Sequence, residues 1–151
     1  MKGVFDLSSH NDLLMKLEWE FDRLIADSSN PYLAYNFFVT AWHLLEWKYP
    51  DPNGRDIRNT IRNQIPLLQI CEHLAVGAKH FELSSAKHQS VLGSKRSDVW
   101  GGSWAEGVWG KGVWASWLVV TLNGDAQEMY GDTIKVDDLA RHVMDYWRTA
   151  K

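Results

Sequence analysis

Residues 32–49, YLAYNFFVTAWHLLEWKY, are apolar on almost every side of a helix. A surface helix carries a polar face, whereas a helix that is apolar all round must be covered by other elements. The stretch therefore predicts the central helix of a helical bundle. It is too short, and with Asn36, His43 and Glu46 too polar, to span a bilayer, so we expect no membrane partner.

The preceding segment, residues 10–27, places its apolar side chains at the i, i+3, i+4, i+7 spacing of an amphipathic helix. Ser8 or Ser9 can cap this helix, and Pro31 can open the central one. The apolar spacing predicts two more helices after the central one, a third that Asp56 caps and a fourth over residues 67–83. Pro66 either kinks this region or begins a new helix, because proline lacks a backbone donor.

The character of the chain changes after residue 83. Residues 84–103 are polar, and residues 100–117 form a Gly/Trp tract, WGGSWAEGVWGKGVWASW. Residues 117–122 then predict a strand, Asn123-Gly124 a hairpin turn and residues 126–130 the return strand. Asp137 can cap a last helix.

These segments predict one α+β domain over residues 1–151, mainly α. It comprises a helical bundle (1–83), the polar and Gly/Trp-rich segment (84–117), and a β-hairpin with a terminal helix (118–151). Sixteen basic against nineteen acidic residues give a net charge of -3, so a nucleic-acid partner is possible but is not indicated by charge. The single cysteine, Cys71, excludes an internal disulfide and a multi-cysteine zinc site. Since the N-terminus shows no signal peptide, we expect a cytoplasmic protein. We also expect no cofactor and no metal.

One candidate catalytic pair lies on the central helix. His43 and Glu46 are three residues apart and share a helix face, as acid/base partners or two metal ligands would. The alternative is a buried histidine that Glu46 holds in the core. His73 and His80 would complete a catalytic set, but they lie two turns apart on their own helix and need residues from a facing helix to share an ion. We expect His43 and His80 to lie on facing helices, close enough to share a ligand.

Basic side chains suggest a different kind of site. Lys79-His80 and Lys87-His88 are matching basic pairs, and with His43 they are our candidate ligand-binding residues, suited to a phosphate or carboxylate. Residues 48–99 carry eight basic and five acidic side chains, whereas residues 1–30 carry three basic and six acidic. The basic segment either faces an anionic ligand or pairs with the acidic first helix.

Several stretches together resemble a family of small bacterial proteins, often encoded on plasmids or prophages. They are YNFFVTAWHLLEW, ICEHLAVGAKHFEL, AKHQSV, the Gly/aromatic tract and LARHVMDYW. The resemblance covers most of the chain from residue 32 onward. It implies a shared architecture with His43, Lys79 and His80 as recurring features, and it carries no activity.

The HEPN ribonucleases are a second comparison, because they too are helical prokaryotic proteins. Their motif is an arginine followed four to six residues later by a histidine. No arginine here has a histidine at that spacing, and Asn63 after Arg58 cannot transfer a proton.

The Gly/Trp tract leaves two interpretations. Exposed, its rings would stack on sugars, bases or a partner surface, and packed, they would cover the bundle, which is our expectation. The sequence thus predicts a non-catalytic binding or accessory protein of a bacterial mobile element, acting on a protein partner. The alternatives are a hydrolase or nuclease using His43, Glu46, His73 and His80, and a small-ligand binder using residues 100–117.

Overall fold

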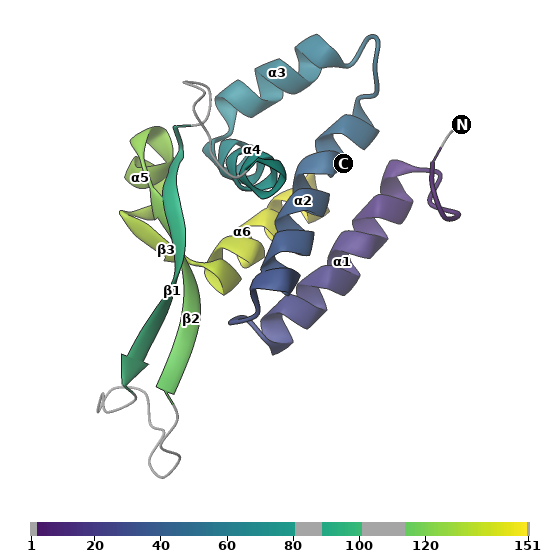
Figure 1. Cartoon of the computed structure of the whole chain (residues 1–151). Helices are drawn as coiled ribbons and strands as arrows, with labels where there is room; N and C mark the ends of the chain where they lie inside the picture. Colours follow the sequence, from purple (N-terminus) through teal and green to yellow (C-terminus); the bar gives the residue numbers. More distant parts are fainter. Residues whose placement is uncertain (1–2, 81–88, 101–113, 151) are drawn as a thin grey trace.

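The computed structural model describes residues 3–80, 89–100 and 114–150 (Figure 1). Its elements are, in chain order, α1 (His10–Ala26), α2 (Pro31–Lys48), α3 (Arg55–Gln64), α4 (Pro66–Lys79), β1 (Val91–Trp100), β2 (Trp114–Leu122), α5 (Gly124–Tyr130), β3 (Thr133–Lys135) and α6 (Val136–Thr149). The chain is therefore an α+β protein, mainly α, which confirms the predicted fold class.

The first two helices begin where their capping residues predict. Ser9 accepts a hydrogen bond from the backbone N–H of Asp12, whose carboxylate accepts from the N–H of Ser9 in return. Hydrogen bonds from the backbone of Ser8 and from the hydroxyl of Ser9 hold the pKa of Asp12 below its usual value. Asn30 caps α2 by accepting from the N–H of Tyr32, 3.1 Å away, and Pro31 occupies the first turn.

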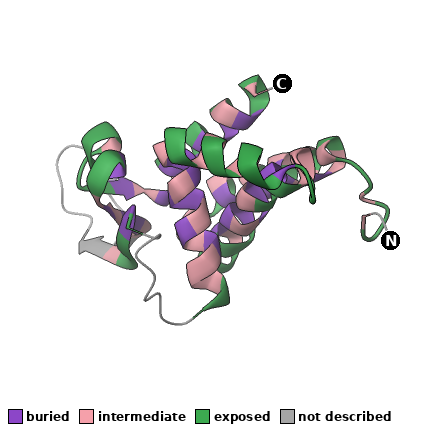
Figure 2. Ribbon diagram, turned by 90° about the horizontal axis from the view of Figure 1, so that it is seen from above, coloured by how far each residue is buried: buried purple, intermediate pink, exposed green. Residues whose placement is uncertain are grey.

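Helix α2 is central, as predicted. It contacts α1, α4 and α6, and α6 lies between the helical layer and the sheet (Figure 1). The buried residues of α1, α2, α4, α5 and α6 form one shared core (Figure 2), whereas α3 has no buried residue and packs the partly buried Ile61 against it. Phe37, Ala41 and Leu44 of α2 are fully buried there with Leu17 of α1 and Leu68 of α4. The apolar stretch of residues 32–49 is thus the scaffold on which α1, α4 and α6 pack.

Pro66 begins a new helix and does not kink one. Ile65 is extended, with φ -123° and ψ 97°, and it separates α3 from α4. The residue before a proline is pushed out of the helical region, which accounts for this break. The prediction that Asp56 caps α3 is wrong. Gly54 is at the cap position, and Asp56 lies within the first turn of the helix.

A three-stranded antiparallel sheet, in the order β1-β2-β3, packs beside the bundle. Arg96 faces Leu118 across the first strand pair, and Val120 faces Ile134 across the second. The predicted strand at residues 117–122 is confirmed as the end of β2.

The predicted hairpin at Asn123-Gly124 is wrong. Residues 124–130 form helix α5, and the strand that returns beside β2 is β3. Ala126 and Tyr130 stand at i, i+4 spacing and turn toward the core, so the helical period prevails over the Asn-Gly turn signal. Gly124 itself has a φ of +59°, which glycine adopts without strain.

The last helix starts two residues earlier than a cap at Asp137 predicts. Val136 is its first residue and is buried, so Asp137 lies in the first turn, where its charge favours the helix dipole, and is not the cap. Among the described residues no helix is long and apolar enough to cross a membrane. Most of the Gly/Trp tract, residues 101–113, lies outside the described residues, and so does its predicted packing on the bundle.

Candidate functional site: a groove beside strand β1

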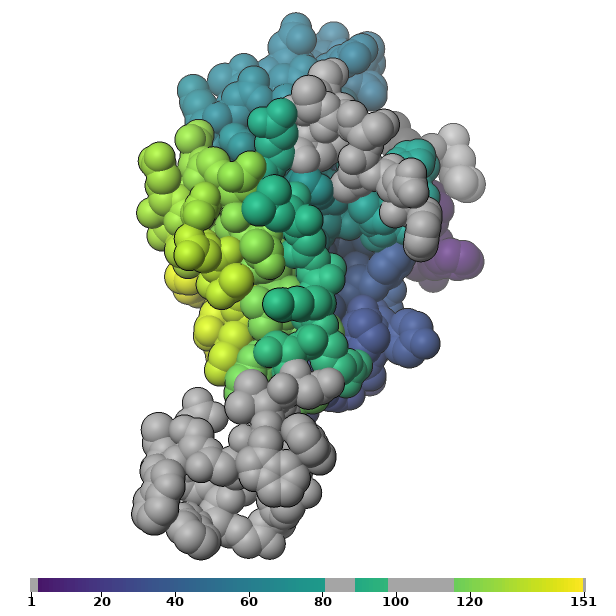
Figure 3. Space-filling view, turned by 60° about the vertical axis from the view of Figure 1, so that its left-hand side comes forward, coloured from purple at the N-terminus to yellow at the C-terminus, as the bar shows by residue number. Residues whose placement is uncertain are grey.

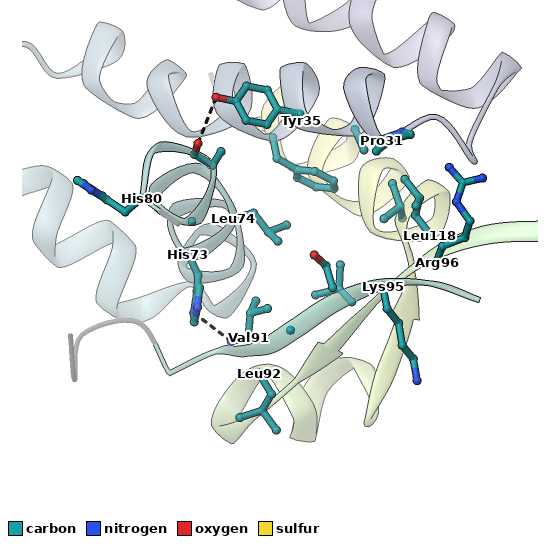
Figure 4. Close-up of a pocket in the computed structure, with 18 residues that line it drawn as sticks. Pro31, Tyr35, His73, Leu74, His80, Val91, Leu92, Lys95, Arg96 and Leu118 are labelled. Atoms are coloured by element: carbon teal, nitrogen blue, oxygen red, sulfur yellow. Dashed lines mark hydrogen bonds between the residues drawn. The ribbon is translucent and has the colours of Figure 1, made fainter. Parts of the chain in front are cut away.

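A groove of about 790 Å³ lies between β1, α2 and α4, and we call it the β1 groove (Figure 4). Its apolar lining comes from β1, through Val91 and Leu92, and from four other elements. Phe38 of α2, Leu74 of α4, Leu118 and Val120 of β2, and Val136 of α6 all contribute to it. Figure 3 shows β1 on the molecular surface, running between the C-terminal elements and α2. The site is therefore a surface groove with an apolar lining.

The titratable side chains of the β1 groove are uniformly basic or neutral. They are His73 of α4 and His80 directly after it, Lys95 and Arg96 of β1, and Tyr35 of α2. No aspartate or glutamate occurs among the described lining residues. A described lining of this composition suits an anionic ligand better than a cationic one.

His73 fixes the start of β1 against α4. Its side chain is 8% exposed, and its Nδ1 accepts a hydrogen bond of 3.2 Å from the backbone N–H of Val91. A buried histidine that satisfies a backbone donor has a structural role at this position. This contact closes one end of the groove.

Two further hydrogen bonds position groove side chains. The Tyr35 hydroxyl donates to the backbone carbonyl of Ala78, 3.3 Å away, and ties α2 to α4 (Figure 4). The Arg96 guanidinium donates to the carbonyl of Ser29 at 3.0 Å and to the hydroxyl of Ser116 at 3.2 Å. Arg96 is thereby held beside the start of α2, with no carboxylate partner among the described residues.

The candidate residues that the sequence suggested do not converge in one place. His73 and His80 line the β1 groove, whereas His43 and Glu46 lie exposed on α2 and do not line it. Among the described residues no hydrogen bond or ion pair joins His43 to Glu46, so the idea of a buried histidine held by Glu46 is wrong. That His43 and His80 share a ligand stays a prediction.

The remaining predicted residues divide as follows. Lys79 is exposed at the last turn of α4, next to the groove residue His80. Lys87 and His88 lie outside the described residues. No group of three or more His, Cys, Asp or Glu side chains that could hold a metal exists within residues 3–80, 89–100 and 114–150.

Cys71 is buried on α4, as its apolar helix stripe predicts. Burial raises the pKa of its thiol to about 12. A thiol is a nucleophile only as the thiolate, which this environment disfavours. Cys71 is therefore a core residue.

Sequence analysis missed Tyr35, Lys95 and Arg96. Residues 91–100 show no apolar alternation, because β1 is an edge strand whose side chains are mostly exposed. The available signal was the adjacent pair Lys95-Arg96 in a stretch of small polar residues. Lys95 and Arg96 belong to a site only because β1 lies beside α2 and α4.

A second cavity, of about 860 Å³, is lined by residues of β1, β2, α5, β3 and α6, and Lys95 of β1 lines both cavities. Lys135 places its Nζ 4.4 Å from the centre of the Trp117 ring, and the rings of Tyr130 and His142 are 5.2 Å apart. Its lining mixes cations with Asp138 and Asp145, so it lacks the single charge sign of the β1 groove.

Among the described residues, no basic side chain of the middle segment forms an ion pair with the acidic first helix. Within the described part of the chain, Arg58 pairs with Asp51 and Arg62 with Glu72, while Glu18 of α1 pairs with Arg148 of α6. This arrangement leaves Lys95 without an ion pair among the described residues.

Comparisons of the chain with protein-family models, with curated proteins and with solved structures find no match.

Proposed function

We propose that the protein is a non-catalytic binding protein, and that the β1 groove holds an acidic, partly apolar segment of a partner protein. The observation that carries this proposal is the lining of the groove, which combines an apolar floor with Lys95, Arg96 and His80 and has no acidic side chain among its described residues. An apolar floor supplies affinity, and charges at the rim supply selectivity and a fast encounter.

The arrangement of the histidines supports binding over catalysis. A hydrolase or nuclease built from His43, Glu46, His73 and His80 would need all four in one site. His43 and Glu46 lie outside the groove, and His73 is engaged by the backbone of β1. General acid/base chemistry requires a group within hydrogen-bond reach of the substrate, which this arrangement does not offer for the set as a whole.

The setting of this function is part of the proposal. The resemblance of residues 32 onward to plasmid- and prophage-borne proteins supports an accessory role in a bacterial mobile element. A single buried cysteine is consistent with a reducing compartment, which supports the cytoplasm.

Selection from a library of random 12-residue displayed peptides tests the proposed function. We expect the selected peptides to be enriched in aspartate and glutamate together with apolar residues. The double variant Lys95→Glu/Arg96→Glu should bind them at least about tenfold more weakly, since it reverses both cations of β1.

The matched control is Arg55→Glu/Arg141→Glu, which changes the net charge equally at exposed positions outside the β1 groove. It should alter affinity less than about threefold, because screened charges at a distance contribute little. Selected peptides without an acidic bias, or equal losses in both double variants, would contradict the proposal. Cleavage of labelled RNA or DNA that His80→Ala abolishes would favour the nuclease instead.

A further inference from the structure

Strand β1 has an open edge. Within residues 3–80, 89–100 and 114–150 it pairs with β2 on one side only, as the sheet order β1-β2-β3 shows. The unpaired N–H and C=O groups of such an edge are a template for another strand. In Figure 4, helices α2 and α4 lie on one side of the groove and β1 on the other, with β2 beyond β1.

The β1 groove follows this open edge. Six consecutive residues, 91–96, line it. Side chains alternate between the two faces of a strand, so a groove bordered by consecutive residues runs along the backbone edge. The edge is capped at its start, where Val91 donates to His73, and from Leu92 to Arg96 no described residue of α2 or α4 bonds to the backbone.

The two sides of β1 differ in chemistry. Figure 4 shows Arg96 directed toward the start of α2 and Lys95 directed away from the helices. The helical wall opposite the edge is mostly apolar or small, with Ala34 and Phe38 of α2 and Leu74 and Gly77 of α4, and it also carries the two histidines His73 and His80. A strand placed along the edge would therefore direct one row of side chains onto an apolar wall and the other toward Lys95.

Charge selects the occupant. Pairing with a second copy of β1 would bring Lys95 and Arg96 close to the same two cations, and facing like charges destabilise a strand pair. An acidic segment meets the same cations favourably, and no described groove residue competes with it. The edge is thus protected against self-association and remains available to an acidic chain.

We propose that an extended acidic segment of the partner protein adds to the open edge of β1 as a fourth strand, with alternate apolar side chains on α2 and α4. This inference rests on the proposed function and specifies how the partner binds. Main-chain hydrogen bonds supply the affinity of such complexes, and alternate side chains supply the specificity.

The probe for this mode is an eight-residue peptide in which valine alternates with glutamate, labelled with fluorescein and measured by polarisation. Two analogues carry N-methyl groups, one on the valine nitrogens and one on the glutamate nitrogens. In an extended peptide the N–H groups of alternate residues point to opposite edges, so each analogue blocks one edge.

Strand addition uses one edge of the peptide. We expect one analogue to bind at least about tenfold more weakly and the other within about threefold of the parent peptide, because several main-chain hydrogen bonds are lost in only one case. Equal losses in both analogues, no loss in either, or no binding of the parent peptide would overturn strand addition. The peptide selection tests the proposed function separately, because it requires no particular backbone conformation.

Discussion

His73, His80 and His43 are the same residue type in three environments, and the environments assign their roles. His73 is buried and holds the start of β1, His80 lines the β1 groove, and His43 is exposed on the outer face of α2. Sequence spacing linked His43 to Glu46, but it did not reveal which side of α2 faces water. A helix that is apolar almost all round gives no such signal, and only packing against α1, α4 and α6 decides it.

The exposure of His43 gives a direct test at this scale. His43→Ala should change the free energy of unfolding by less than about 0.5 kcal/mol, as is usual for surface positions. Its neighbour Leu44 is fully buried, and Leu44→Ala should cost about 2–5 kcal/mol. Chemical denaturation of both variants measures the difference. A loss of more than about 1 kcal/mol in His43→Ala would show that this side chain belongs to the core.

At the scale of elements, a bidentate ion pair joins the middle of α1 to the C-terminal end of α6. Arg148 donates through Nε to one oxygen of Glu18 at 2.9 Å and through Nη2 to the other at 2.6 Å. Hydrogen bonds from Arg148 hold the pKa of Glu18 below its ordinary value, and the same bonds raise the pKa of Arg148. The pair thus couples the first helix to the last.

A depressed carboxyl pKa makes this coupling depend on pH. The stabilisation is fully present above the pKa of an unfolded glutamate, about 4.3, and is lost as the pH falls through the lower folded value. Glu18→Gln should therefore lower stability at neutral pH by about 0.2–1 kcal/mol, because both partners are partly exposed, and by progressively less in acid.

Thermal melting from neutral pH downward measures this effect. The control is Glu128→Gln on the exposed side of α5, which should match the parent protein throughout. A deficit in Glu18→Gln that stays constant into strong acid would contradict the assignment to the ion pair.

The helices and strands also show how much of the fold the sequence predicts. Helices α1 and α2 were found within a residue or two because Ser9, Asn30 and Pro31 supply local start signals. The sequence does not predict strand β1, because an exposed edge strand needs no apolar face. It predicts a strand where α5 forms, because Asn123-Gly124 also suits a hairpin turn. Pairing with β2 and packing of Ala126 settle these two cases, and both are long-range effects.

For the whole molecule, the distribution of charge matters more than its sum. The net charge is -3, yet the described lining of the β1 groove contains only basic and neutral side chains. The excess of basic residues in the middle of the sequence is compatible with an anionic ligand or with pairing to the acidic first helix, and His80 is one of the candidate ligand contacts. Lys95, Arg96 and Tyr35 could not be named, because their site exists only once β1 lies beside α2 and α4.

We propose that the partner binds in the β1 groove, and amide hydrogen exchange tests this location. Exchange is compared for the free protein and for the protein saturated with the strongest peptide from the selection. We predict slower exchange concentrated at residues 92–96, where an added strand would accept the open N–H groups of β1. Slower exchange on β3 and α6 at the second cavity, with residues 92–96 unchanged, would contradict binding in the β1 groove.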